Sequence, residues 1–210
     1  MISLSEVLHT IAQALLIPCL IILLILMAGA VWQIGDIVVE YIAERRKHKC
    51  EVPQLLRDVH TAGADGLADL IENSGLLRRQ KKALLELAES RNLPKDTLTA
   101  LAERLLATEE ARNARTTSVT DMIAKLGPMF GLLGTLIPLG PGIVALGQGD
   151  TVTLSESMNV AFDTTIAGVI SAAVASVISH IRKRWYNDDM VSLETLMEAV
   201  LEEVTADVEG

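Results

Sequence analysis

The residues best suited to chemistry in this 210-residue chain are an acid and two hydroxyls inside long apolar runs. Thr135 interrupts one run, and Asp163 and Thr165 interrupt the next. A charged side chain costs about 3 kcal/mol in the centre of a bilayer, so ionisable residues there indicate a function by default. Threonine hydroxyls both donate and accept hydrogen bonds, as a proton relay through a dry interior requires. We therefore predict an ion path with Thr135, Thr165 and Asp163 as its candidate residues.

Simpler interpretations of the same residues stay open. A threonine in a membrane helix usually donates to a carbonyl one turn earlier, which is a structural role. Asp163 continues a polar stripe with Glu156 and Asn159, so it is either solvated from the outer side or placed in a vestibule that attracts cations. Because Asp163 and Thr165 are two positions apart, a helix points them in nearly opposite directions, and they are not expected to share one site.

Small residues accompany these polar side chains at helical spacing. Gly127, Gly131 and Gly134 share one face of the first run, and Gly168 and Ala172 belong to a small-residue face in the next. Small residues let helix backbones approach closely, which makes both faces candidates for helix packing. We expect these faces to be buried between the protomers of an oligomer.

Three apolar segments are long enough to cross a bilayer, which takes about 20 residues. They cover approximately residues 11–34, 123–146 and 157–181. Half of the residues are hydrophobic and the mean hydropathy is +0.37, as in a short membrane protein. Because no alternating pattern of a β-barrel occurs, we predict an all-α polytopic membrane protein with three transmembrane helices and an extended cytoplasmic helical bundle.

The distribution of lysine and arginine predicts the orientation of the chain. Basic clusters at 45–49 and 182–184 follow the first and third spans, whereas the residues before the first span and the link 147–156 contain no lysine or arginine. The positive-inside rule then places the N-terminus outside and the C-terminus in the cytoplasm, across the plasma (inner) membrane. A cleaved signal peptide is disfavoured, because its basic start is missing and the apolar run is too long.

This orientation divides the chain into four regions. They are an N-out first transmembrane helix over 1–42, a cytoplasmic helical region over 43–121, the second and third transmembrane helices over 122–182 and a cytoplasmic amphipathic helix over 183–210.

Helix-breaking residues refine these regions. Breaks are expected at 63–66, 73–75 and 92–94, and after Pro94 one helix can continue into the second span. Pro138 and Pro141 are expected to bend that span or end it early. The C-terminal helix should pack on the other cytoplasmic helices through the apolar stripe Met190, Leu193, Met197, Val200 and Val204.

Composition argues against several classes of function. The net charge of −9 disfavours nucleic-acid binding, which needs a basic face. Cys19 lies in the first span and Cys50 in the cytoplasmic region, so they are not expected to form a disulfide, and His48 beside Cys50 is too sparse for a metal site. No phosphate-binding loop or catalytic triad is recognisable, so we predict neither a cofactor nor an enzyme.

The sequence LGPMFGLLGT at 126–135 closely resembles the second-span motif of the MotA/TolQ/ExbB proton-channel family, and AFDTTIAG at 161–168 resembles its third-span motif. The resemblance implies a homo-pentamer in which these two spans line a pore. That pore would hold a separate single-span partner similar to ExbD, TolR or MotB, whose membrane aspartate carries the ion and drives work in the cell envelope. Thr135 and Thr165 match the family's pore threonines. The prolines at 138 and 141 and the acid at 163 depart from its common pattern.

Two other functions are considered. A non-conducting oligomeric scaffold would use the same small-residue faces, but its hydroxyls would be dispensable. A membrane-embedded enzyme would need its reactive groups at one depth. Asp163 and His180 are seventeen positions apart, about 25 Å along one helix, so they cannot form one active site.

Overall fold

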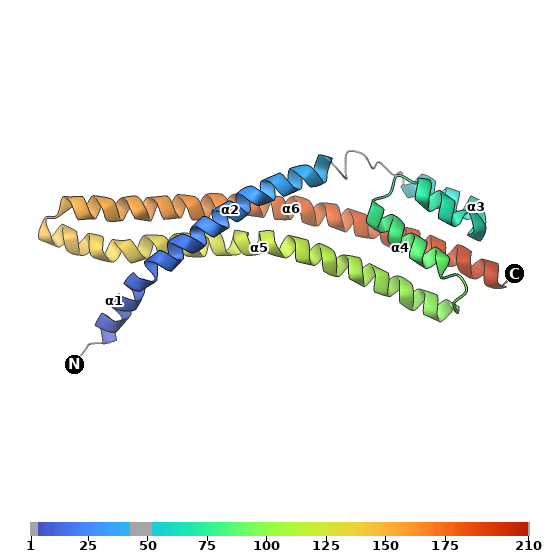
Figure 1. The fold of residues 1–210 in the computed structure, drawn as a ribbon, viewed down its shortest axis with the longest axis horizontal. Coiled ribbons are helices and arrows are strands. Elements are labelled where there is room, and N and C mark those ends of the chain that lie inside the picture. Colours follow the sequence, from blue (N-terminus) through green and yellow to red (C-terminus); the bar gives the residue numbers. More distant parts are fainter. Residues whose placement is uncertain (1–3, 43–51, 210) are drawn as a thin grey trace. The chain divides into compact units, whose positions relative to one another are not determined.

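The computed structural model describes residues 4–42 and 52–209, and the regular structure in this part of the chain is entirely helical, without strands (Figure 1). In chain order its helices are α1 (Leu4–Ala14), α2 (Leu16–Glu40), α3 (Val52–Asn73), α4 (Arg78–Glu89), α5 (Lys95–Gln148) and α6 (Thr151–Glu209). Three stretches are long and apolar enough to cross a membrane: Glu6–Glu40, Lys95–Gln148 and Thr151–Ala206. The prediction of an all-α protein with three membrane-spanning helices is confirmed. The basic cluster 45–49, with His48 and Cys50, lies outside the described residues.

The chain divides into two compact units. The membrane unit consists of Met1–Ile37 and Thr117–Ile181, and the α3–α4 unit consists of Val38–Thr116 and Arg182–Gly210. Both α5 and α6 contribute to each unit, because each continues from a polar segment into a membrane span.

The helix α5 is continuous from Lys95 to Gln148, as the absence of glycine and proline between Pro94 and Gly127 predicts. The expectation that Pro138 or Pro141 ends it early is wrong, since both lie inside the helix. A proline removes one backbone donor, but membrane helices tolerate this loss when neighbouring groups satisfy the freed carbonyl.

The link between α5 and α6 reverses the chain in a few residues. Gly149 adopts φ 76°, a left-handed conformation that favours glycine. Asp150 then caps α6: its Oδ2 accepts from the Thr153 hydroxyl at 2.6 Å, and its Oδ1 accepts from the N–H groups of Thr153 and Val152 at 3.1 and 3.2 Å. These hydrogen bonds, above all that from the Thr153 side chain, lower the pKa of Asp150.

The core of the α3–α4 unit is apolar and contains the predicted C-terminal stripe. Leu193, Met197, Val200 and Val204 are buried against residues of α3, α4 and α5, and Met190 is half-buried. The packing role of the stripe is confirmed, although the stripe belongs to the continuous helix α6 and not to a separate element.

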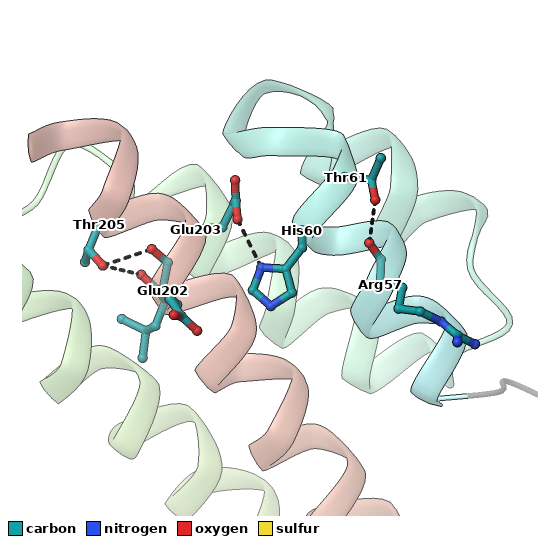
Figure 2. Close-up of polar contacts among 7 residues, drawn as sticks. Arg57, His60, Thr61, Glu202, Glu203 and Thr205 are labelled. Carbon is teal, nitrogen blue, oxygen red and sulfur yellow. Dashed lines mark hydrogen bonds and ion pairs between the residues drawn. The ribbon is translucent and has the colours of Figure 1, made fainter. Parts of the chain in front are cut away.

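The helix α3 is kinked at Gly63, which has φ 67° and ψ 174°, within the predicted break at 63–66. Figure 2 shows the polar contacts beside this kink. His60 Nδ1 lies 3.4 Å from Glu203 Oε2 on α6, while the Thr61 hydroxyl donates to the Arg57 carbonyl at 2.8 Å. The His60–Glu203 contact therefore joins α3 to α6 in addition to the apolar core.

Candidate ion pathway

The spans of α5 and α6 lie side by side (yellow and orange in Figure 1) and are in backbone contact. A Cβ atom added at Gly168 would lie 2.5 Å from the Gly127 carbonyl oxygen and 2.9 Å from Gly131 Cα. One added at Gly127 would lie 2.7 Å from the Gly168 oxygen and 3.1 Å from the Ala172 Cβ. Side chains cannot occupy such gaps, so Gly127 and Gly168 are required for this approach of the two helices.

The other two glycines of α5 differ in how much room they have. A Cβ atom at Gly134 would lie 2.6 Å from Thr164 Cβ, a direct overlap. At Gly131 its nearest neighbour would be the Thr164 carbonyl oxygen at 3.4 Å, which is close to an ordinary contact. The two glycines therefore look alike in the sequence, but the structure excludes a side chain at Gly134 and leaves nearly enough room for one at Gly131.

These contacts correct the expectation that both faces are buried between protomers. Gly127, Gly131 and Gly134 are buried against Gly168, Ala172 and their neighbours within one chain. Since each face already covers the other, neither is available to a second protomer.

The helix α2 covers one flank of the α5–α6 pair. Leu26 and Ala30 of α2 form a buried cluster with Ile123 of α5 and Ala175 of α6, and Phe130 and Val174 pack against its edge. In addition, Cys19 Sγ donates to the Phe130 carbonyl at 3.3 Å. Phe130 and Val174 therefore mark the side of each helix that faces α2.

Both candidate threonines lie on the opposite flank. Thr165 precedes Val174 by nine positions, about two and a half helical turns, so the two side chains leave α6 on opposite sides. Thr135 follows Phe130 by five positions, a rotation of about 140° around α5. Because each threonine points away from α2, the two hydroxyls share one side of the helix pair.

The two threonines also lie at one depth. The contacts of Gly131 with Gly168 and of Gly134 with Thr164 fix the antiparallel register, which places Thr135 level with Thr164 and Thr165. Both candidates are half-buried in the single chain. The sequence-predicted pair is therefore brought to one level and one flank.

Each hydroxyl donates to its own helix. Thr135 Oγ1 donates to the Leu132 carbonyl at 2.7 Å, and Thr165 Oγ1 donates to the Ala161 carbonyl at 3.0 Å. A hydroxyl that donates its one proton still has oxygen lone pairs to accept with. In this conformation the two residues are suited to accept hydrogen bonds from a protonated carboxyl group or a water.

Asp163 is separated from the threonines. It precedes Val174 by eleven positions, about three full turns, so it lies on the side of α6 that faces α2 further along the helix. Its side chain is exposed in the single chain. The three candidates therefore do not form one cluster.

Sequence reasoning missed Thr164, the residue beside Thr165. Thr164 is only 4% exposed and packs under Gly134, and its hydroxyl donates within α6 to Val160 and Ala161. The signal was present, since Thr164 precedes Gly168 by four positions and so shares its face.

A second polar contact that the sequence did not predict lies further along the same two helices. Ser179 Oγ of α6 donates to Asp121 Oδ1 of α5 at 2.5 Å. Ser179 is buried and Asp121 is half-buried. The hydrogen bond joins α5 to α6 near the end of the spans that leads into the α3–α4 unit.

Over residues 4–42 and 52–209, no three His, Cys, Asp or Glu side chains are grouped so that they could hold a metal ion.

The fold and the site together define a class: a multi-pass helical membrane protein whose two interlocked spans carry hydroxyls at one depth. The family model of the MotA/TolQ/ExbB proton channel family matches residues 71–195, which include all of α5 and most of α6. The chain belongs to this family, whose members are subunits of proton channels in energising motors. No match was found among curated proteins.

Proposed function

We propose that this chain is the channel-forming subunit of an inner-membrane motor that converts proton-motive force into mechanical work or transport in the cell envelope. The main support is the pair Thr135 and Thr165, which lie at one depth and on one flank inside the family-matched region. Five copies would surround a pore, with the flank opposite α2 of each copy facing inward. The N-terminus would lie outside and the C-terminus in the cytoplasm.

The pore would hold a separate single-span partner similar to ExbD, TolR or MotB, with an aspartate at the depth of the threonines. In the protonated state that carboxyl group can donate to the free lone pairs of Thr135 or Thr165. After it loses the proton, it needs donors, and a threonine can supply one only by releasing its bond to Leu132 or Ala161. The two hydroxyls would thus stabilise the partner's acid differently in its two protonation states.

Disulfide crosslinking tests this orientation. In a Cys19→Ala, Cys50→Ala background, Thr165→Cys should crosslink to a cysteine placed beside the partner's aspartate. Asp163→Cys is the matched control, because it lies two positions away on the other side of α6. Crosslinking through position 163 but not through position 165 would contradict the proposed pore lining.

The position of Asp163 supports a structural role for it on the outer part of α6. Asp163→Asn should therefore leave proton flux unchanged at external pH values between about 5 and 8. A selective loss of flux with intact assembly would instead place Asp163 in the vestibule of the channel.

A further inference from the structure

The basic residues of this acidic protein are concentrated in three clusters. Of its 18 lysines and arginines, four lie at 45–49, four at 78–82 and three at 182–184. The first and third clusters directly follow membrane spans, where the positive-inside rule accounts for them. The cluster at 78–82 follows no span, so that rule does not explain it.

Within α4 this cluster occupies the less favourable end of the helix. Arg78, Arg79, Lys81 and Lys82 surround the N-terminus, whereas the acids Glu86 and Glu89 lie toward the C-terminus. The helix dipole makes the N-terminus positive and favours the opposite arrangement. The bases therefore repel one another and the dipole. Glu72, Glu86 and Glu89 line the same surface hollow as Arg78 and Lys82 and offset part of this repulsion, and an anion at the N-terminus would relieve the rest.

Three of the four bases are available to such an anion. Lys81 is engaged, since its Nζ donates to the Glu72 carbonyl at 2.7 Å. Arg78, Arg79 and Lys82 have exposed side chains. Over the described part of the chain, no acidic side chain lies within 4 Å of their charged groups in an ion pair.

The start of α4 is held beside the segments that leave the membrane. Gln80 Nε2 donates to the Asp189 carbonyl of α6 at 3.0 Å. Leu77, Arg79 and Gln80 line one cavity together with Glu40, the last residue of α2, and Tyr186 of α6. The acids Glu109 and Asp189 line the same cavity. Each of these contacts lies within the α3–α4 unit.

The neighbouring residues have the character of a membrane interface. Arg182 forms an ion pair with Glu40 at 3.1 Å, and the rings of Tyr41 and Trp185 stack with centroids 6.1 Å apart. Aromatic rings of this kind and basic residues gather at the headgroup level of a bilayer.

The residue of α6 that holds α4 lies a short way along the chain from the end of the third span. Asp189, to which α4 is bonded, follows Arg182 by seven residues, about 10 Å along the helix. The headgroup layer is roughly 5–8 Å thick on each side, and charges interact over a Debye length of about 8 Å in physiological salt. Long arginine and lysine side chains extend their charged ends toward such a surface.

We propose that Arg78, Arg79 and Lys82 bind the phosphate headgroups of anionic phospholipids in the leaflet that borders the α3–α4 unit. Guanidinium groups can form paired hydrogen bonds to phosphate oxygens, and lysine adds a point charge. Each base near an anionic membrane surface contributes about fivefold in affinity, so three bases should contribute on the order of a hundredfold. The proposal concerns a lipid site and does not depend on ion conduction.

Native mass spectrometry of the full-length protein tests this site, with short-chain phosphatidylglycerol and phosphatidylcholine as probes. The variant Arg78→Gln, Arg79→Gln, Lys82→Gln should bind phosphatidylglycerol on the order of a hundredfold more weakly than wild type. The control Lys95→Gln, Arg104→Gln, Arg112→Gln removes the same charge from exposed positions of α5 and should bind like wild type. Circular dichroism checks that both variants keep their helix content.

Three results would overturn the proposal. They are equal losses in the two triple variants, no loss in the α4 variant, and equal binding of phosphatidylcholine and phosphatidylglycerol by wild type. Inorganic phosphate is added as a competitor in a separate arm. If it displaced the lipid at equal concentration, the patch would recognise free phosphate and not a membrane-held headgroup.

Discussion

Replacing Gly168 with alanine tests the backbone contact between α5 and α6 most sharply. The added methyl group would lie 2.5 Å from the Gly127 oxygen and 2.9 Å from Gly131 Cα, both of which are backbone atoms that cannot rotate away. The two helices must therefore separate. Gly131→Ala is the matched comparison, because its methyl group would meet atoms no closer than 3.4 Å.

The expected difference can be estimated from these contacts. Overpacking a close contact costs about 1–3 kcal/mol. Alanine is favoured over glycine inside a helix by roughly 0.5–1 kcal/mol, but both variants gain this amount, so it cancels in their difference. Gly168→Ala should thus be less stable than Gly131→Ala by about 2 kcal/mol, or about 4–8 °C in Tm for a chain of this size.

Thermal unfolding in a fixed mild detergent, followed by the fluorescence of Trp32 and Trp185, measures this difference. Native mass spectrometry at low temperature would show whether the oligomer has formed before heating. Equal Tm values for the two variants, or a lower value for Gly131→Ala, would refute the packing described for Gly168.

Three further predictions concern polar contacts. Ser179→Ala removes the donor to Asp121 and should destabilise the protein by about 1–3 kcal/mol, measured as a loss of Tm. Arg182→Gln breaks a pair in which Arg182 is 1% exposed and Glu40 is 17% exposed, and should cost about 3 kcal/mol by the same measurement. Burial of the Tyr186 side chain is the main cause that raises its pKa, and the negative charge of Glu40 is the second. As pH rises, the unfolded chain releases the Tyr186 hydroxyl proton first, at a pKa of about 10. The free energy of unfolding should therefore fall as pH rises above about 10. Denaturant titrations should show a smaller fall in Tyr186→Phe.

Matched controls separate these effects from general damage. Ser176→Ala and Arg184→Gln change exposed residues on the same helix, and exposed substitutions usually alter stability by less than about 0.5 kcal/mol. A control that lost as much stability as its partner variant would contradict the corresponding contact. For Tyr186, the same dependence of stability on pH in wild type and Tyr186→Phe would contradict the shifted pKa.

Patterns along the chain predict the helices well, because they depend on local spacing. The run without glycine or proline after Pro94 indicates that α5 continues into the second span, and it does. The stripe at Leu193, Met197, Val200 and Val204 predicts a buried face that the structure contains. In both cases the periodicity of a helix fixes which residues point the same way.

The same patterns cannot show which helix packs against a given face. Two small-residue faces can meet within one chain or between chains, and helical spacing is identical in the two cases. Thr164 and Thr165 are about 100° apart around α6, so either can border the contact, and only the overlap with Gly134 selects Thr164. The pairs Arg182–Glu40 and Asp121–Ser179 span 142 and 58 positions, and no local signal predicts them.

Proton flux through the purified complex tests the proposed channel most directly. The protein and its single-span partner would be reconstituted in liposomes, and a potassium diffusion potential would drive protons past an internal pH dye. Wild type should conduct. The variant Thr135→Val, Thr165→Val should lose most of the flux with its assembly unchanged, since it removes only two hydroxyls at nearly constant volume. Equal flux in wild type and the variant, or no flux in a correctly assembled wild-type complex, would contradict the account.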